Sequence, residues 1–231
     1  MIQLEKINQL YGSSQILWNL DLNIPKGSCV CLMGRNGAGK TTLLKCLMGL
    51  LPIKNGEITI DSQRMSKLPA EKRAHMGVGY VPQGRDIFPQ LTVEENLRIG
   101  LACRKDRLKV IPDKVFQLFP VLKEMLSRRG GDLSGGQQQQ LAIGRALVID
   151  PKLLILDEPN EGIQPNIVQQ IGDVITLLNE EEGMTVLLVE QKLNFARKVG
   201  KEFRLMEKGR IVASGSMPEL SDALIKQHLA V

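Results

Sequence analysis

The chain has 231 residues, of which 43% are hydrophobic and 24% are charged, and its formal net charge is +5. This composition is typical of a folded globular protein, and the length suits one large α/β domain. The apolar runs are far shorter than the roughly 20 residues of a membrane-spanning helix, and no leader segment is recognisable, so we expect a cytoplasmic location. Aromatic residues make up only 3%, which leaves few platforms for stacking single-stranded nucleic acid.

The N-terminal region has the alternation expected of a sheet. Ile2–Ile7 and Ile16–Ile24 predict two strands joined through a turn at Tyr11–Ser14. Tyr11 has two interpretations, an amphipathic surface ring or a stacking platform for a purine base.

A glycine-rich segment, here called the phosphate loop, has the pattern G-x-x-x-x-G-K-[ST]. It follows an apolar run at Ser28–Met33 and opens a helical pattern at Thr42–Leu50, which is the setting that a phosphate-binding loop requires. Glycines let backbone N–H groups approach phosphate, and the helix N-terminus adds partial positive charge. The phosphate loop consists of Gly34, Arg35, Asn36, Gly37, Ala38, Gly39, Lys40, Thr41 and Thr42. We therefore expect it to bind a nucleoside triphosphate, with Lys40 at the β- and γ-phosphates and Thr41 on Mg²⁺.

The middle of the chain changes from strands to helices. Asn55-Gly56 predicts a turn before a strand at Glu57–Ile60, and Val78–Val81 predicts another strand that leads into Gln83. Beyond it, Leu91–Leu101, begun by Thr92, and Asp113–Leu126 have helical patterns.

The segment Leu133–Gln137, here called the signature segment, precedes a helical pattern that ends near Ile149. Its Ser134-Gly135-Gly136 can be a flexible turn before a helix whose glutamines face solvent. The same residues fit an anion site made of a hydroxyl and bare N–H groups at a helix N-terminus. Spacing alone does not decide between these alternatives.

Leu153–Leu156 predicts a buried strand that ends in two carboxylates, Asp157 and Glu158. The carboxyl ends of parallel strands border the ligand crevice, where the phosphate loop also lies. We expect Asp157 to contact Mg²⁺ and Glu158 to polarise an attacking water.

The C-terminal part continues the α/β pattern. Thr185–Val189 predicts a buried strand that ends at Gln191, Phe203–Glu207 and Ile211–Ala213 predict a hairpin, and Met217–Leu229 predicts a terminal helix. The chain is thus expected to form one domain over 1–231, in which 1–82 and 150–231 build an α/β core and 83–149 form an inserted helical subdomain.

Together these motifs resemble the ATP-binding subunits of ABC transporters over essentially the whole chain. The resemblance implies a P-loop NTPase core with a mostly parallel sheet, an N-terminal antiparallel β subdomain and an inserted helical subdomain. It implies a head-to-tail dimer that sandwiches two ATP molecules, with the phosphate loop of one subunit facing Ser134, Gly135, Gly136 and Gln137 of the other.

The resemblance also implies roles for single residues. Tyr11 corresponds to the base-stacking aromatic, Gln83 to the glutamine that senses Mg²⁺ and the membrane subunits, and Glu158 to the catalytic base. Two positions depart from the usual pattern, because Gln191 stands where a switch histidine is common and Gln164 where an aspartate is common. An amide can hydrogen-bond a γ-phosphate but cannot carry the proton or charge of imidazole.

Val189–Gln191 and Glu161–Ile163 are similar to ATPases of importers for branched-chain amino acids and urea. The stretches Val81–Arg85, with Gln83, Gln137–Gln140 and Glu161–Pro165 resemble the urea type more, with the branched-chain amino acid type as the alternative. A soluble ABC ATPase acting on nucleic acid or ribosomes is a third possibility, and such proteins usually carry coiled-coil insertions or two fused cassettes.

The resemblance implies ATP and Mg²⁺ as cofactors and a site at the cytoplasmic face of the membrane. The implied partners are permease subunits, a second identical or paralogous ATPase subunit and, indirectly, a solute-binding protein. No nucleic-acid partner is expected.

Overall fold

The computed structural model describes residues 1–104 and 106–229, so residues 105, 230 and 231 of the predicted 1–231 domain lie outside the description. The strands are β1 (Ile2–Tyr11), β2 (Ser14–Ile24), β3 (Cys29–Met33), β4 (Asn55–Ile60), β5 (Gln63–Arg64), β6 (Val78–Val81), β7 (Leu153–Asp157), β8 (Thr185–Val189), β9 (Glu202–Glu207) and β10 (Arg210–Ser216). The α-helices are α1 (Lys40–Met48), α2 (Ala70–His75), α3 (Val93–Leu101), α4 (Asp113–Leu118), α5 (Pro120–Glu124), α6 (Gly135–Val148), α7 (Pro165–Glu180), α8 (Leu193–Val199) and α9 (Asp222–His228). Short 3₁₀ turns cover Gly130–Asp132 and Met217–Glu219.

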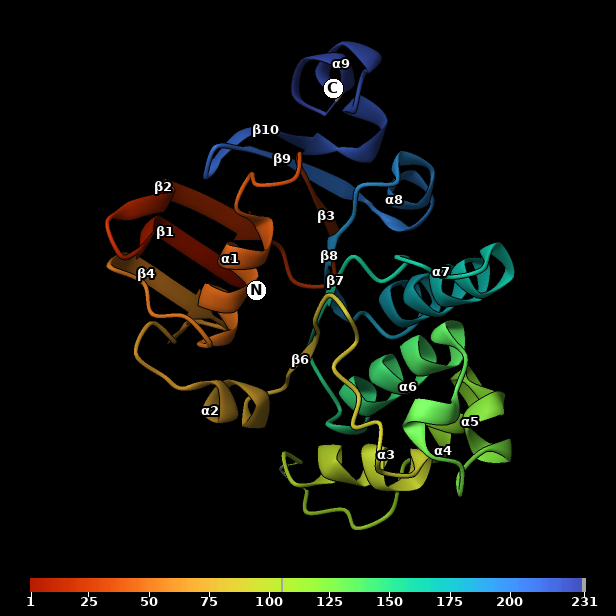
Figure 1. Cartoon of the computed structure of the whole chain (residues 1–231). Coiled ribbons are helices and arrows are strands. Elements are labelled where there is room, and N and C mark those ends of the chain that lie inside the picture. The colour runs from red at the N-terminus through yellow and green to blue at the C-terminus, as the bar shows by residue number, and fades with distance from the viewer. Residues whose placement is uncertain (105, 230–231) are drawn as a thin grey trace.

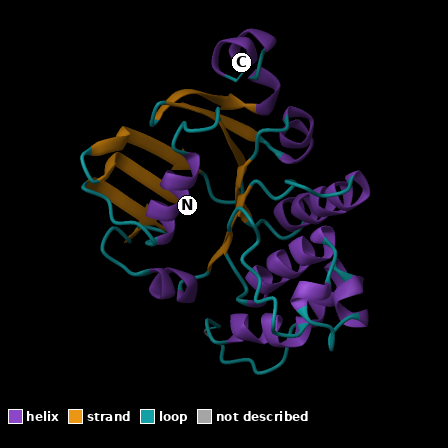
Figure 2. Ribbon diagram, in the orientation of Figure 1, coloured by secondary structure: helices purple, strands orange, loops and turns teal. Residues whose placement is uncertain are grey.

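The strands form two sheets (Figures 1 and 2). The larger has the order β10-β9-β3-β8-β7-β6, in which β9, β3, β8, β7 and β6 are parallel and β10 pairs with β9 antiparallel. The smaller has the order β2-β1-β4-β5, and all of its pairs are antiparallel. The predicted fold class, an α/β core with a mostly parallel sheet and an N-terminal antiparallel subdomain, is confirmed.

Apolar runs explain the central position of the larger sheet. Every residue of β3, β7 and β8 is buried, as expected for parallel strands that are covered on both faces. Figure 1 shows α1 between the two sheets and the helices α3–α8 beyond the other face of the larger sheet. Two hydrophobic cores therefore form, one on each side of β3 and β7.

Three predictions about local structure are wrong. Asp113–Leu126 forms two helices, α4 and α5, because Pro120 disfavours helical backbone at Phe119, where φ is −133° and ψ is 75°. Asn55-Gly56 lies inside β4 and not in a turn, because the chain approaches β1 so closely that a Cβ on Gly56 would lie 2.5 Å from the Glu5 carbonyl oxygen. The terminal segment is a 3₁₀ turn followed by α9, which Ser221 caps through the Leu224 N–H.

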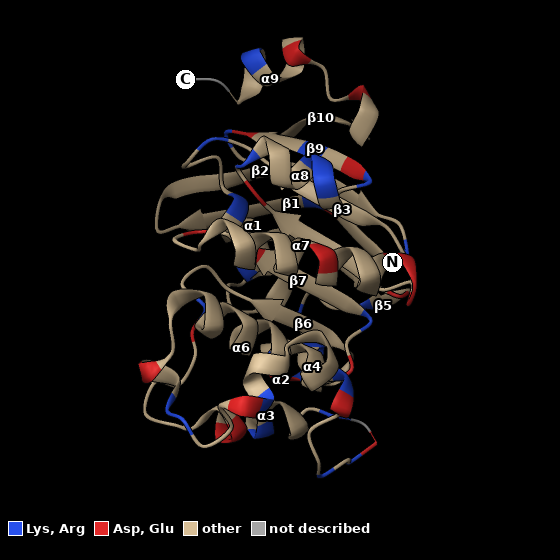
Figure 3. Cartoon of the chain, turned by 90° about the vertical axis from the view of Figure 1, so that its right-hand side faces the viewer, with Lys and Arg blue, Asp and Glu red and all other residues tan. Residues whose placement is uncertain are grey.

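The surface of the helical side carries both charge signs. Figure 3 shows acidic and basic residues side by side on α3, where Arg98 and Glu94 form an ion pair of 2.7 Å. Among the described helices, none is both long and apolar enough to cross a membrane.

Candidate functional site

A cavity of about 460 Å³ opens at the carboxyl ends of the central strands. Its walls come from segments far apart in the sequence: β2, the phosphate loop with the start of α1, the loop after β6 and the loop after β7. The lining residues are Ile16, Asn36, Gly37, Gly39, Lys40, Thr41, Thr42, Gln83 and Glu158. Six of the nine phosphate-loop residues therefore line one cavity together with Gln83 and Glu158.

The phosphate loop wraps the N-terminus of α1, and Gly37 and Gly39 have φ angles of 79° and 105° that only glycine adopts easily. Lys40 folds back over the loop and donates hydrogen bonds to the Gly34 carbonyl at 2.8 Å and the Arg35 carbonyl at 3.2 Å. Burial lowers the pKa of Lys40, and the nearby carboxylates of Glu158 and Asp157 partly oppose that fall. A partly desolvated ammonium beside a helix N-terminus is suited to binding an anion such as phosphate.

Asp157 ends β7 beneath the phosphate loop and is only 1% exposed. Neither of its carboxylate oxygens has a hydrogen-bond partner among the described residues. Burial raises the pKa of Asp157 to about 6, although the neighbouring Thr41 hydroxyl opposes the rise, and the charge of Glu158 adds to it. A buried carboxylate without a partner fits a divalent cation, because the cation would neutralise its charge and satisfy its oxygens.

Glu158 follows in a left-handed backbone conformation, with φ of 49°, that turns its side chain into the cavity. One of its oxygens lies 3.9 Å from Lys40 Nζ and accepts a hydrogen bond of 2.5 Å from Gln191 Nε2. Its other oxygen is 3.5 Å from Gln83 Nε2, which donates more closely, at 3.0 Å, to Glu161. The carboxylate is thus held by amide donors while it remains an acceptor at the cavity wall.

Gln191 joins the site from the loop after β8. Its amide donates to Glu158 and also, at 2.9 Å, to Asn36 Oδ1 of the phosphate loop. The side chain that replaces an expected histidine therefore bridges the carboxylate and the loop. It has no proton to lose near neutral pH.

Two predicted elements lie apart from the cavity walls. Tyr11 is 46% exposed and does not line the cavity, whereas Ile16, which the sequence interpretation missed, does. The signature segment also stays outside the lining, and Ser134 and Gln137 form a reciprocal cap at the start of α6. The interpretation that the glutamines of the helix that follows face solvent is wrong for Gln139 and Gln140, which are 3% and 1% exposed.

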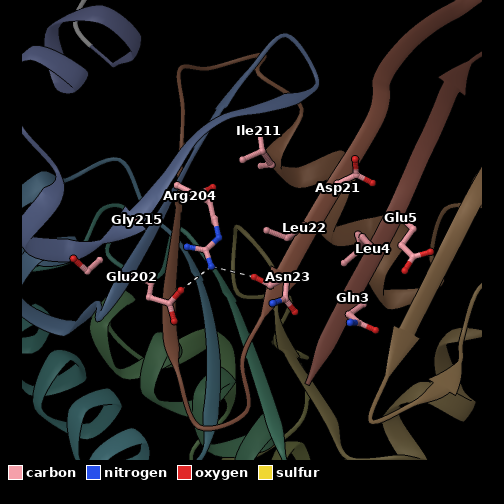
Figure 4. Close-up of a pocket in the computed structure, with 12 residues that line it drawn as sticks. Gln3, Leu4, Glu5, Asp21, Leu22, Asn23, Glu202, Arg204, Ile211 and Gly215 are labelled. Atoms are coloured by element: carbon pink, nitrogen blue, oxygen red, sulfur yellow. Dashed lines mark hydrogen bonds and ion pairs between the residues drawn. The ribbon is translucent and has the colours of Figure 1, made fainter.

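A larger hollow of about 780 Å³ lies elsewhere, between the edges of the two sheets. Figure 4 shows Arg204 spanning it, with hydrogen bonds to Glu202 and to the Asn23 carbonyl. None of the phosphate-loop residues lines this hollow. Arg204, the cation that spans this hollow, already has hydrogen-bond partners. The greater volume of the hollow therefore does not make it the phosphate site.

Comparison with known proteins agrees with this geometry. Residues 17–161 match the ABC transporter family. The chain is 45% identical to the high-affinity branched-chain amino acid transport ATP-binding protein BraG of Pseudomonas aeruginosa, over 92% of this chain and 91% of BraG. It is 36% identical to a probable branched-chain amino acid transport ATP-binding protein, LivF, of Archaeoglobus fulgidus, over 95% and 94% of the two chains.

A solved dimeric structure of the ATP-binding cassette MJ0796, in a post-hydrolysis state bound to ADP and Pi, superposes with a TM-score of 0.84 and 27% identity. That match covers 94% of this chain and 99% of the cassette. The ADP conformation of MJ1267, an ATP-binding cassette of an ABC transporter, gives 0.82 and 27%, over 98% and 97% of the two chains. The chain therefore belongs to the ABC transporter family, as one of its ATP-hydrolysing subunits.

Proposed function

We propose that this chain hydrolyses ATP to drive an importer of branched-chain amino acids. ATP hydrolysis is supported most directly by the position of Lys40 Nζ, which lies 3.9 Å from a Glu158 carboxylate oxygen in the cavity that the phosphate loop lines. The relatives BraG and LivF support the solute class.

The phosphate loop holds the triphosphate through backbone N–H groups and Lys40. The Lys40 ammonium is hydrogen-bonded to two carbonyls of its own loop, and phosphate oxygens would replace those weaker, neutral acceptors. Thr41, Asp157 and Gln83 are the residues that would hold Mg²⁺, which when bound neutralises charge on the phosphates. Ile16 offers an apolar wall next to Gly39, and Tyr11 remains our proposal for stacking the base.

Glu158 acts as the general base that accepts a proton from the attacking water. Its carboxylate faces the cavity, accepts a short hydrogen bond from Gln191 and lies 3.5 Å from the Gln83 amide, and these contacts orient it toward the cavity. Gln191 supplies a neutral hydrogen-bond donor to the terminal phosphate in place of an imidazole.

The signature segment completes the site of a second subunit. Ser134 and Gln137 do not line the cavity of their own chain, yet they present a capped helix N-terminus suited to an anion. A head-to-tail pair would bring this helix end to the nucleotide of the partner, and the MJ0796 cassette bound to ADP and Pi, which is dimeric, supports pairing of two such chains. We also keep the division into an α/β core and a helical subdomain over 83–149, because it places the signature segment and the phosphate loop in different parts of the chain.

Permease subunits, reached through Gln83 and the helical subdomain, and a solute-binding protein complete the assembly, with this chain peripheral on the cytoplasmic face. The solute is not expected to touch the chain. The preference for urea drawn from Gln83 and Gln137 is weaker than the support from the relatives, which favours the branched-chain alternative.

The test is ATPase stimulation in a reconstituted transporter with its own binding protein. We expect stimulation by leucine and none by urea, since a loaded binding protein can only act by favouring one state of the ATPase pair. Stimulation by urea and not by leucine would reject the solute class and leave the importer standing. An intact complex that hydrolyses no ATP under any solute would reject the function.

A further inference from the structure

The ends of β7 and β8 carry two buried polar residues that no phosphate contact requires. Asn160, two residues after Glu158, is 1% exposed, and Glu190, immediately before Gln191, is 3% exposed. Asn160 Nδ2 donates to Glu190 Oε2 at 2.8 Å, so a side-chain bond joins the two loops beyond the last paired residues of the strands, Asp157 and Val189.

The second oxygen of Glu190 fixes the backbone beside Gln191. Glu190 Oε1 accepts hydrogen bonds from the N–H groups of Gln191 at 2.7 Å and Lys192 at 2.8 Å. The Lys192 ammonium returns to the Asn160 carbonyl at 3.1 Å, and the Glu190 N–H donates to the Leu32 carbonyl of β3 at 3.3 Å. The Glu190 carboxylate thus joins the loops after β7 and β8, while the backbone N–H of the same residue bonds β3.

Keeping these groups buried is costly. Burial raises the pKa of Glu190, although its hydrogen bonds oppose the rise. Asn160 Oδ1 is also buried with no hydrogen-bond partner among the described residues. A well-packed apolar pair would avoid both costs. What the polar pair adds is a fixed link between the loop that follows Glu158 and the loop that carries Gln191.

We propose that Asn160 and Glu190 are positioning residues for ATP hydrolysis, which hold the Glu158 carboxylate and the Gln191 amide at their mutual contact. This proposal rests on the proposed hydrolytic function. Neither residue touches the nucleotide cavity. Their loss should therefore lower kcat while nucleotide affinity stays close to that of the parent.

The pair can be tested by exchanging its chemistry. Glu190→Gln puts an amide NH₂ against the Asn160 amide, and Asn160→Asp puts two carboxylates together, so each single variant should lose roughly five- to hundred-fold in kcat. In the double variant, the introduced glutamine can still accept from both backbone N–H groups through its oxygen, and its NH₂ can donate to the introduced aspartate. We expect the double variant to recover most of the parent kcat, with KM and nucleotide affinity within about twofold in all variants.

Two further measurements separate positioning from folding. Asn179 is a matched control, since it is also 3% exposed and its amide bonds only the Gly27 and Met184 carbonyls, so Asn179→Asp should lower thermal stability without lowering kcat. In a Gln191→Ala background, Glu190→Gln should cost little more, because both act through the same contact.

Parent-like kcat in Glu190→Gln, or no recovery in a folded double variant, would overturn the proposal. Additive losses in the Gln191→Ala background would also overturn it. A parent chain without ATPase activity would instead reject the proposed function.

Discussion

Gln191→Ala is the most informative single substitution in the nucleotide site. The amide makes two hydrogen bonds, at 2.5 Å to the Glu158 carboxylate and at 2.9 Å to Asn36. A bond to a charged group contributes about 1.5–3 kcal/mol and one to a neutral group about 0.5–1.5 kcal/mol. Because Gln191 is exposed to solvent, we expect the loss in transition-state stabilisation to be about 1–3 kcal/mol, or roughly five- to hundred-fold in kcat.

Steady-state ATP hydrolysis and direct nucleotide binding measure this effect. The expected pattern is a lower kcat with nearly unchanged nucleotide affinity, since Lys40 and the phosphate loop are intact. Gln191→His is the matched variant: it should introduce a titration step near pH 6.5, whereas the parent has no such step from this position because an amide does not ionise there. An alanine variant that hydrolyses ATP at the parent rate would show that Gln191 is only a solvated residue at a strand end.

The remaining predictions concern the metal and the composite site. Burial raises the pKa of Asp157 from 3.8 to about 6, so the unfolding free energy of the nucleotide-free parent should fall as pH rises through this window. Asp157→Asn should then be more stable than the parent by up to roughly 3 kcal/mol above pH 6, with no gain below about pH 4 in urea denaturation. Adding Mg²⁺ to the ATP-bound variant should also raise its stability less than it raises that of the parent, and equal pH profiles would contradict this prediction. Lys40→Ala and Ser134→Arg chains should each be inactive, and mixing them should restore partial activity, because the mixed dimer has one intact site. If subunits exchange but no activity returns, and no cross-link forms between the phosphate loop and the partner's signature segment, the head-to-tail dimer is contradicted.

Local patterns predicted the sheet well because its strands are buried on both faces. The run Cys29–Met33 is apolar throughout and Thr185–Val189 is apolar after its first residue, which is typical of strands covered on both faces of a sheet. The phosphate loop and the Asp157-Glu158 pair were also predictable, since their chemistry depends on adjacent residues. Pro120 was a readable signal that the helical prediction over Asp113–Leu126 ignored.

Contacts between distant strands were not predictable from spacing. Asn160 and Glu190 look like ordinary loop residues in the sequence, and only the pairing of β7 with β8 brings them together. Ile16 lines the cavity because β2 passes beside Gly39, which no local pattern indicates. Gln140 is buried against Gln170 of α7, so its solvated interpretation failed for a tertiary reason.

Glu158 is proposed to serve as the base for ATP hydrolysis at the phosphate loop. The most direct test is a paired measurement of turnover and ATP affinity in Glu158→Gln, an almost isosteric amide that cannot accept the proton of the water. We predict that turnover is abolished while ATP binding is retained, and near-normal turnover would show that Glu158 is not the base.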